Sequence, residues 1–151
     1  MALLENKLMN HPTSPQEFTF PIRVYYEDTD AGGVVFYANY LKFFERARTE
    51  WLRHLGVNQS ALVDSEKTIF VVVGTQVQYK SPAKLDDALL IKSRLTKVGN
   101  ASVNFEQICE RDGQVLVQSS IQVCSVNTET FKAAPIPASV RSLLLSVQDT
   151  Q

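Results

Sequence analysis

Three carboxylates lie within a span of four residues and are followed by two glycines. Residues 25–40, YYEDTDAGGVVFYANY, contain Glu27, Asp28 and Asp30 and then Gly32-Gly33. Glycine allows backbone conformations that a Cβ atom forbids, and it lets a ligand approach closely. A carboxylate beside the free N–H groups of a helix start could attack a carbonyl, or direct water at it, while those groups hold the carbonyl oxygen.

Other functions compete for the same residues. Acidic residues before a helix often act only as caps, and Asp-x-x-Gly is common in turns. An EF-hand calcium loop would need Asp or Asn at Gly32 and Glu at Asn39. A haloacid-dehalogenase-type phosphatase would need alternating helices and strands, which the sequence lacks. A metal site using Asp28 and Asp30 stays open, as does a structural role for Asp28 in the turn.

Signatures of other catalytic types are missing from the sequence. It contains no GxSxG, GxGxxG, P-loop or HExxH motif. Of its two histidines, His11 lies in the polar N-terminal stretch and His54 near the end of a predicted helix. An enzyme of this sequence must therefore use a carboxylate. That favours a thioester substrate, because a thiol with a pKa of ~8.5 leaves with little help from a general acid.

One long helix, expected from about Ala38 to Leu55, must position these groups. The positions on its apolar side are Tyr40, Phe43, Phe44, Ala47, Trp51 and Leu55. Gly56 marks its end. Arg48 lies toward the apolar side, where it either extends to solvent, pairs locally or positions a nearby acid.

Strands are predicted on both sides of this helix. The expected strands span residues 18–26, 68–79, 89–98, 102–110 and 115–126, with a connector up to residue 67 and a short helix over 138–147. Asp112-Gly113 is a hairpin signal. Four strands in direct succession indicate antiparallel pairing.

The strand at residues 68–79 suggests a partner subunit. Its pattern places Ile69, Val71, Val73, Val77 and Tyr79 on one face, and leaves Phe70 and Val72 as apolar residues on the other. One helix cannot cover both faces of a five-stranded sheet. We therefore expect at least a dimer.

Composition bounds the function. The 151 residues are 44% hydrophobic and 21% charged with a net charge of -1, which predicts one globular domain over 17–151 behind a flexible arm at 1–16. The balanced charge gives no global attraction for nucleic acid. Cys109 and Cys124 suggest neither a disulfide framework nor a zinc site. The sequence has no membrane-spanning run and no secretory signal, so we expect a cytoplasmic protein.

Residues 23–56, RVYYEDTDAGGVVFYANYLKFFERARTEWLRHLG, carry a family resemblance. With DTDAGGVV, a Tyr-x-x-Tyr step and ERAR, this segment resembles the hotdog-fold acyl-CoA thioesterases of the 4-hydroxybenzoyl-CoA thioesterase group. It is most similar to the bacterial branch named for its association with the Tol-Pal envelope system. The resemblance continues through VQYKSPAKLDD, residues 77–87, and more loosely to the end.

The resemblance implies an α+β hotdog fold, in which a five-stranded antiparallel sheet wraps around one long central helix. It also implies homodimers or homotetramers that hydrolyse acyl-CoA, or acyl carrier protein, thioesters. Such enzymes need neither a metal nor a cofactor, since coenzyme A is part of the substrate. The alternative is a non-catalytic hotdog module that binds acyl carrier protein or an envelope-complex partner.

The resemblance also assigns roles in the site. Asp30 would act as nucleophile, through a mixed anhydride, or as general base for water. The backbone N–H of Tyr37 would polarise the thioester carbonyl, with Gly33 and Val34 flanking it. Several close relatives have His at the position of Tyr37, and a backbone role survives that difference.

Coenzyme A carries phosphates, so basic side chains are needed near the mouth of the pocket. Matching to the family points to Lys97 and Lys132, with Lys84 as a third candidate.

Overall fold

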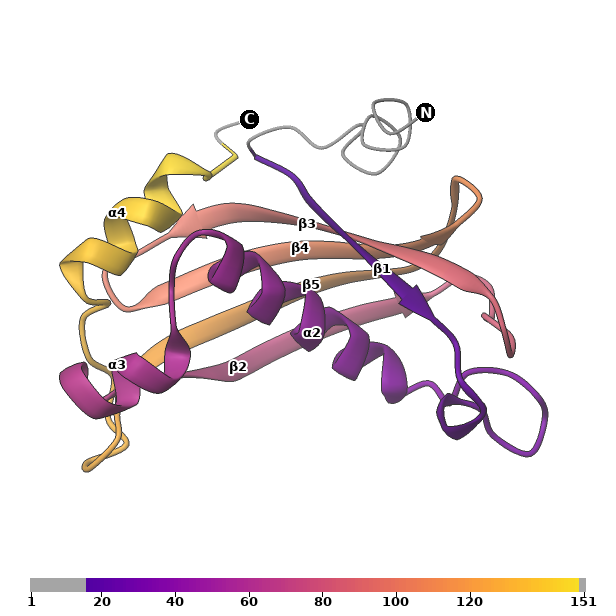
Figure 1. Ribbon diagram of the computed structural model, residues 1–151, viewed down its shortest axis with the longest axis horizontal. Coiled ribbons are helices and arrows are strands. Elements are labelled where there is room, and N and C mark those ends of the chain that lie inside the picture. The colour runs from indigo at the N-terminus through magenta and orange to yellow at the C-terminus, as the bar shows by residue number, and fades with distance from the viewer. Residues whose placement is uncertain (1–15, 150–151) are drawn as a thin grey trace.

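The computed structural model describes residues 16–149, in which a five-stranded antiparallel sheet packs against one long helix (Figure 1). The strands are β1 (Phe18–Arg23), β2 (Thr68–Tyr79), β3 (Ala88–Val98), β4 (Ser102–Arg111) and β5 (Gln114–Asn127), in the spatial order β1-β3-β4-β5-β2. The helices are the 3₁₀ turn η1 (Tyr26–Asp28), α2 (Asn39–His54), α3 (Gln59–Glu66) and α4 (Ala138–Ser146). The predicted α+β class and antiparallel pairing are confirmed. The predicted arm at residues 1–16 lies, apart from Gln16, outside the described residues.

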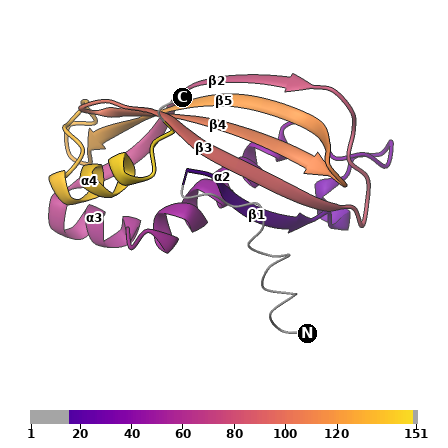
Figure 2. The ribbon, with the colours of Figure 1, turned by 90° about the horizontal axis from the view of Figure 1, so that it is seen from above.

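Helix α2 lies under the curved sheet (Figure 2), with its apolar side inward. Phe43, Phe44 and Ala47 are fully buried. Trp51 lies between two other aromatic rings, stacked on Phe18 at 5.8 Å and edge-on to Phe105 at 6.2 Å between ring centroids. This burial, rather than local helix propensity, fixes α2 on the sheet.

A polar network also ties α2 to the sheet. Arg48 is buried, and its Nη1 donates to Gln107 Oε1 at 2.9 Å. Gln107 Nε2 in turn donates to the carbonyl of Phe44 and to Ser93 Oγ, both at 2.9 Å. The three roles predicted for Arg48 do not describe this geometry. The side chain turns inward and bonds a strand residue that the helical pattern could not identify.

The side-chain pattern predicted for β2 is wrong, because the strand contains a bulge. Pairing with β5 shifts between Val72 and Gly74, so Val73 has no partner. Phe70 and Val77, on either side of the bulge, both pack against the core. Ile69 and Val71 therefore face away from the helix, whereas Val77 faces it. The single apolar face expected for the whole strand does not exist.

The turn between β4 and β5 agrees with the sequence prediction, whereas helix α3 was not predicted. Asp112 and Gly113 have positive φ angles of 51° and 82°, as the predicted two-residue hairpin between β4 and β5 requires. Helix α3 falls inside the stretch predicted as a connector. Its N-cap is Asn58, whose Oδ1 accepts from the Ala61 N–H at 3.1 Å.

Candidate active site

A short hairpin joins η1 to the start of α2. Glu27 and Asp28 lie in η1, and Asp30 lies on the hairpin itself. The Asp30 N–H donates to the carbonyl of Val34 at 2.9 Å. The Phe36 N–H donates to the carbonyl of Asp28 at 3.0 Å. These bonds hold Asp30 and the residues before α2 on one small structural unit.

The hairpin docks on the loop between β2 and β3. The Val35 N–H donates to the carbonyl of Ala83 at 2.9 Å, and Val34 forms a bridge with Lys84. The Ala83 N–H donates to the Tyr40 hydroxyl at 3.0 Å. Burial raises the pKa of Tyr40, against a smaller opposite effect of this hydrogen bond. The sheet loop, the hairpin and α2 are thus joined within one turn of the helix.

The Asp30 carboxylate is exposed and oriented by the glycines that follow it. Its Oδ1 accepts from the Gly32 N–H at 2.8 Å, and its carbonyl accepts from the Gly33 N–H at 3.0 Å. Gly33 has a φ of +81°, which disfavours a side chain there. A Cβ atom on Gly32 would lie 3.2 Å from Asp30 Oδ1. Among residues 16–149 no donor is bonded to Oδ2, so this oxygen can face a substrate or water.

Asp28 differs from Asp30 in both burial and bonding. Its side chain is buried, and Oδ2 accepts from the Tyr25 N–H at 2.8 Å. Its carbonyl also accepts from Asn39 Nδ2 at 2.9 Å. These contacts support the structural role in the turn. In the part of the chain that the structure describes, no three His, Cys, Asp or Glu side chains gather as metal ligands would.

Tyr37 lies at the open end of α2. Regular helix begins at Asn39, whose N–H donates to the carbonyl of Phe36 at 2.8 Å. The Tyr37 N–H has no acceptor within the described range, as expected for a helix start. The Tyr37 side chain is 63% exposed, and its ring borders a hollow of about 240 Å³ that Val35, Tyr40, Tyr79 and residues 80–82 complete.

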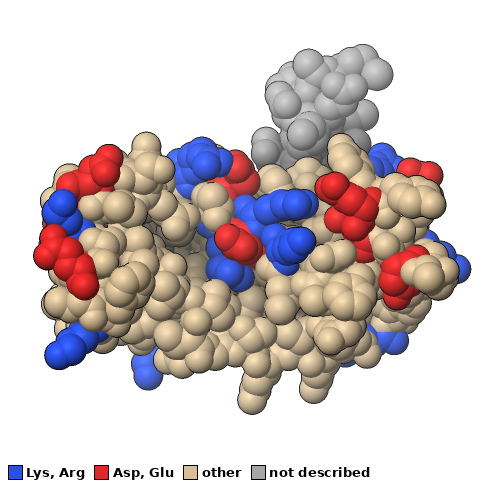
Figure 3. All heavy atoms as spheres, turned by 90° about the horizontal axis from the view of Figure 1, so that it is seen from below, with Lys and Arg blue, Asp and Glu red and all other residues tan. Residues whose placement is uncertain are grey.

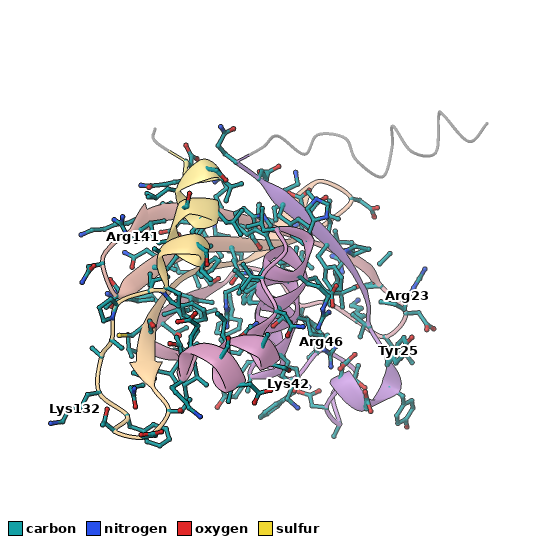
Figure 4. All side chains as sticks on the ribbon, turned by 60° about the vertical axis from the view of Figure 1, so that its left-hand side comes forward. Arg23, Tyr25, Lys42, Arg46, Lys132 and Arg141 are labelled. Atoms are coloured by element: carbon teal, nitrogen blue, oxygen red, sulfur yellow. The ribbon has the colours of Figure 1, made fainter. Side chains whose placement is uncertain are left out.

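The three candidate lysines lie at different places in the fold. Lys84 adjoins the hairpin through its bridge with Val34. Lys97 lies near the opposite end of β3, ten strand residues or roughly 30 Å from that loop. Lys132 follows β5. Figure 4 shows it on the opposite side of the molecule from Tyr25, the residue that precedes η1 and the hairpin. One chain therefore brings only Lys84 to the hairpin.

Asn39 and Tyr79 also belong to this region, and the sequence alone points to neither of them. Asn39 reads as an ordinary helix-start residue, and Tyr79 as one more aromatic residue in a strand. No pattern in the chain indicates that the hydroxyl of Tyr79 meets the start of α2, 42 residues earlier, where it donates to the carbonyl of Tyr37 at 3.0 Å.

Within residues 16–149, none of the helices combines the length and the hydrophobicity that a membrane span requires.

Comparisons with known proteins show the family and the fold. The family model described as the thioesterase superfamily matches residues 32–118. The chain is 43% identical over 125 residues to the acyl-CoA thioesterase YbgC of Haemophilus influenzae, covering 83% of this chain and 92% of that one. It is 44% identical over 124 residues to the acyl-CoA thioester hydrolase YbgC of Escherichia coli, covering 82% and 92%.

Solved structures show the same fold. A probable thioesterase from Bartonella henselae superimposes with a TM-score of 0.76 at 36% sequence identity, over 80% of this chain and 99% of that chain.

Proposed function

The chain belongs to the thioesterase superfamily, and from this premise we propose that it hydrolyses acyl-CoA thioesters to a free acid and a thiol. The observation that carries the proposal is the hairpin at the start of α2. It carries an exposed carboxylate, Asp30, and leads into Tyr37, whose N–H has no acceptor among residues 16–149. The named relatives act on acyl-CoA, which supports the same substrate class here.

The chemistry needs an attacking group and a site for the oxyanion. Asp30 either takes a proton from water as the water oxygen adds to the thioester carbon, or adds itself and forms an anhydride that water cleaves. The developing oxyanion accepts from the Tyr37 N–H, at the positive end of α2. With water as the nucleophile, the C–S bond breaks as the tetrahedral intermediate collapses, and the proton held by Asp30 passes to the thiolate. With Asp30 as the nucleophile, the C–S bond breaks as the anhydride forms, and the proton set free when water cleaves the anhydride neutralises the thiolate.

Gly33 and Val34 would flank the carbonyl in this arrangement. Gly33 is exposed and has no atom within 4 Å of the position of a Cβ, so a substrate can approach its backbone. The neighbouring bridge from Val34 to Lys84 keeps this side of the hairpin fixed.

Lys84 is the phosphate-binding candidate that a single chain places near Asp30. Lys97 and Lys132 would have to act from a neighbouring subunit, because both lie toward the other end of the fold. The reaction as written uses only water and needs no cofactor.

A homo-oligomer is part of the proposal. The two edges of the sheet differ: β1 is short and contains Pro21, which blunts an edge, whereas β2 has twelve residues and no charged side chain. Val72 and Val73 on β2 are 50% and 58% exposed. Figure 3 shows the molecule from below. Lys, Arg, Asp and Glu side chains cluster in the upper half of this view, and a broad band below them is mostly uncharged. We infer that β2 pairs with a second copy of this chain.

The choice between dimer and tetramer, the cytoplasmic location and the Tol-Pal association stay predictions.

The decisive experiment is thiol release from acetyl-, butyryl-, benzoyl- and palmitoyl-CoA by the wild type and by Asp30→Asn. We expect the variant to lose roughly 100-fold or more in kcat on the best substrate while it melts like the wild type. Glu27→Gln, which alters an exposed carboxylate in the same turn, should keep wild-type activity.

Wild-type turnover by Asp30→Asn would refute the mechanism. Silence of the folded wild type on the whole panel would direct the test to acyl carrier protein thioesters. Silence there as well would favour the non-catalytic module.

A further inference from the structure

Tyr79, the last residue of β2, contacts the start of α2 from the sheet. Its hydroxyl donates to the carbonyl of Tyr37 at 3.0 Å. Its ring is edge-on to that of Tyr37, at 6.1 Å between centroids, and tilted against Tyr40 at 5.8 Å. The side chain is 47% exposed, so this contact is not a simple consequence of core packing.

The contact supports the second of the two peptide groups that meet at the Cα atom of Tyr37, and the start of α2 holds the first. The Phe36 carbonyl accepts from the Asn39 N–H at 2.8 Å. In a trans peptide the N–H points opposite to the carbonyl, so the Tyr37 N–H points away from the helix. Residues 37 and 38 precede the regular helix, and the hydrogen bond from Tyr79 holds the far side of Tyr37.

We propose that Tyr79 is a positioning residue for thioester hydrolysis: its hydroxyl fixes the Tyr37 carbonyl and thereby keeps the Tyr37 N–H aimed at the substrate oxygen. The inference rests on the proposed function, in which that N–H polarises the thioester. Tyr79 acts through Tyr37, and its ring also forms a wall of the hollow beside it.

The phenol keeps its proton while it does so. Desolvation raises the pKa of Tyr79 above its ordinary value, and the neighbouring Tyr37 adds to the effect. The hydroxyl therefore stays a donor throughout the range from about pH 5 to 9.

The test compares Tyr79→Phe with the wild type on the acyl-CoA that the wild type hydrolyses fastest. Removing only the hydroxyl should lower kcat about two- to tenfold, the worth of one neutral hydrogen bond, and leave KM unchanged. The ratio of the two kcat values should stay constant from pH 5 to 9. Tyr26→Phe, which removes an exposed hydroxyl outside the hollow, serves as the matched control.

Hydrogen exchange tests the positioning without reference to activity. In Tyr79→Phe, the amides of Asn39 and Leu41, which donate to the carbonyls of Phe36 and Ala38, should exchange about two- to tenfold faster than in the wild type and in Tyr26→Phe. Unchanged exchange there, or a wild-type kcat in Tyr79→Phe, would overturn the inference. A stepwise change of the kcat ratio with pH would also overturn it, because it would indicate proton transfer by the phenol.

The two proposals fail in different ways. A folded wild type that releases no thiol refutes the proposed function, whatever the exchange data show. An active wild type with an equally active Tyr79→Phe refutes only the role of Tyr79.

Discussion

At the scale of single residues, the orientation of the Asp30 carboxylate depends on the absence of one carbon atom. Gly32 donates its N–H to Asp30 Oδ1, and a Cβ atom at Gly32 would come within 3.2 Å of that same oxygen. Few real Cβ contacts are so short, so the carboxylate must move. In the proposed mechanism Gly32 therefore helps to set the position of the attacking carboxylate although it has no side chain.

We expect Gly32→Ala to lower kcat by roughly tenfold, because a small displacement of a reacting group is costly. The melting temperature should stay close to that of the wild type, since Gly32 is exposed and its φ lies outside the left-handed region. Steady-state thiol release and a thermal melt measure the two effects. A wild-type kcat in a folded Gly32→Ala would show that the carboxylate tolerates the shift.

The sequence could single out the segment around Asp30 as a candidate site, whereas the choice of Asp30 within it comes from the family resemblance and stays a prediction. Closely spaced carboxylates, two glycines and a helix start occur in one continuous segment, so chemistry and backbone freedom are visible together. Tyr79 and Gln107 could not be predicted in the same way. Their roles depend on contacts with residues 42 and 63 positions away, and a hydrogen bond across that separation leaves no local pattern.

At the scale of elements, the loop between β2 and β3 is the support on which the hairpin rests. Asp87 holds this loop: its Oδ2 accepts from the Lys84 N–H at 2.8 Å and pairs with Arg111 at 2.6 Å. Desolvation alone would raise the pKa of Asp87, but the Lys84 N–H and the Arg111 guanidinium outweigh it and lower the pKa.

A lowered pKa in the folded state gives stability that is complete above the unfolded value of ~3.9 and is lost as the pH falls through the folded value. We therefore expect Asp87→Asn to reduce the free energy of unfolding by about 1–2 kcal/mol at pH 7. Urea unfolding at several pH values should show this difference shrinking below pH ~4.

Asp64→Asn is the control, because this exposed carboxylate of α3 forms no ion pair among residues 16–149. Its effect should be small at every pH. A difference for Asp87→Asn that persists unchanged into acid would contradict the ionic role of Asp87.

The elements themselves were predicted to different degrees. Helix α2 was predicted within one residue at each end, because its apolar stripe matches the buried side. Helix α3 was missed because its eight residues carry only one buried apolar side chain, Leu62. Asn58, the N-cap of α3, precedes a stretch in which apolar residues do not recur at helical spacing.

At the scale of the whole molecule, β2 is an edge strand of the sheet and is the surface through which we propose that copies of the chain pair. A long edge strand without charges can pair with another strand, and a lysine placed in it opposes such pairing. We expect Val73→Lys to shift the protein from an oligomer toward the monomer in sedimentation velocity. Val63→Lys, at an exposed valine of α3, should leave the sedimentation unchanged.

A wild type that sediments as a monomer would refute the proposed pairing. An oligomer that Val73→Lys leaves intact would place the interface elsewhere. The sequence predicted a partner from the face of Phe70 and Val72, and the structure removes that argument because Phe70 packs against the core. The expectation of an oligomer now depends on the edge of β2 instead.

The bulge at Val73 also determines how β2 can change by insertion or deletion during evolution. Val72 pairs with Val123 and Gly74 with Gln122, the next residue of β5, so loss of the codon for Val73 would leave regular pairing and keep the other side chains of β2 on their present faces. A related chain can therefore lack this residue and still present the same side chains of β2 to α2. An alignment that closes the gap a residue too early would compare inward-facing positions with outward-facing ones.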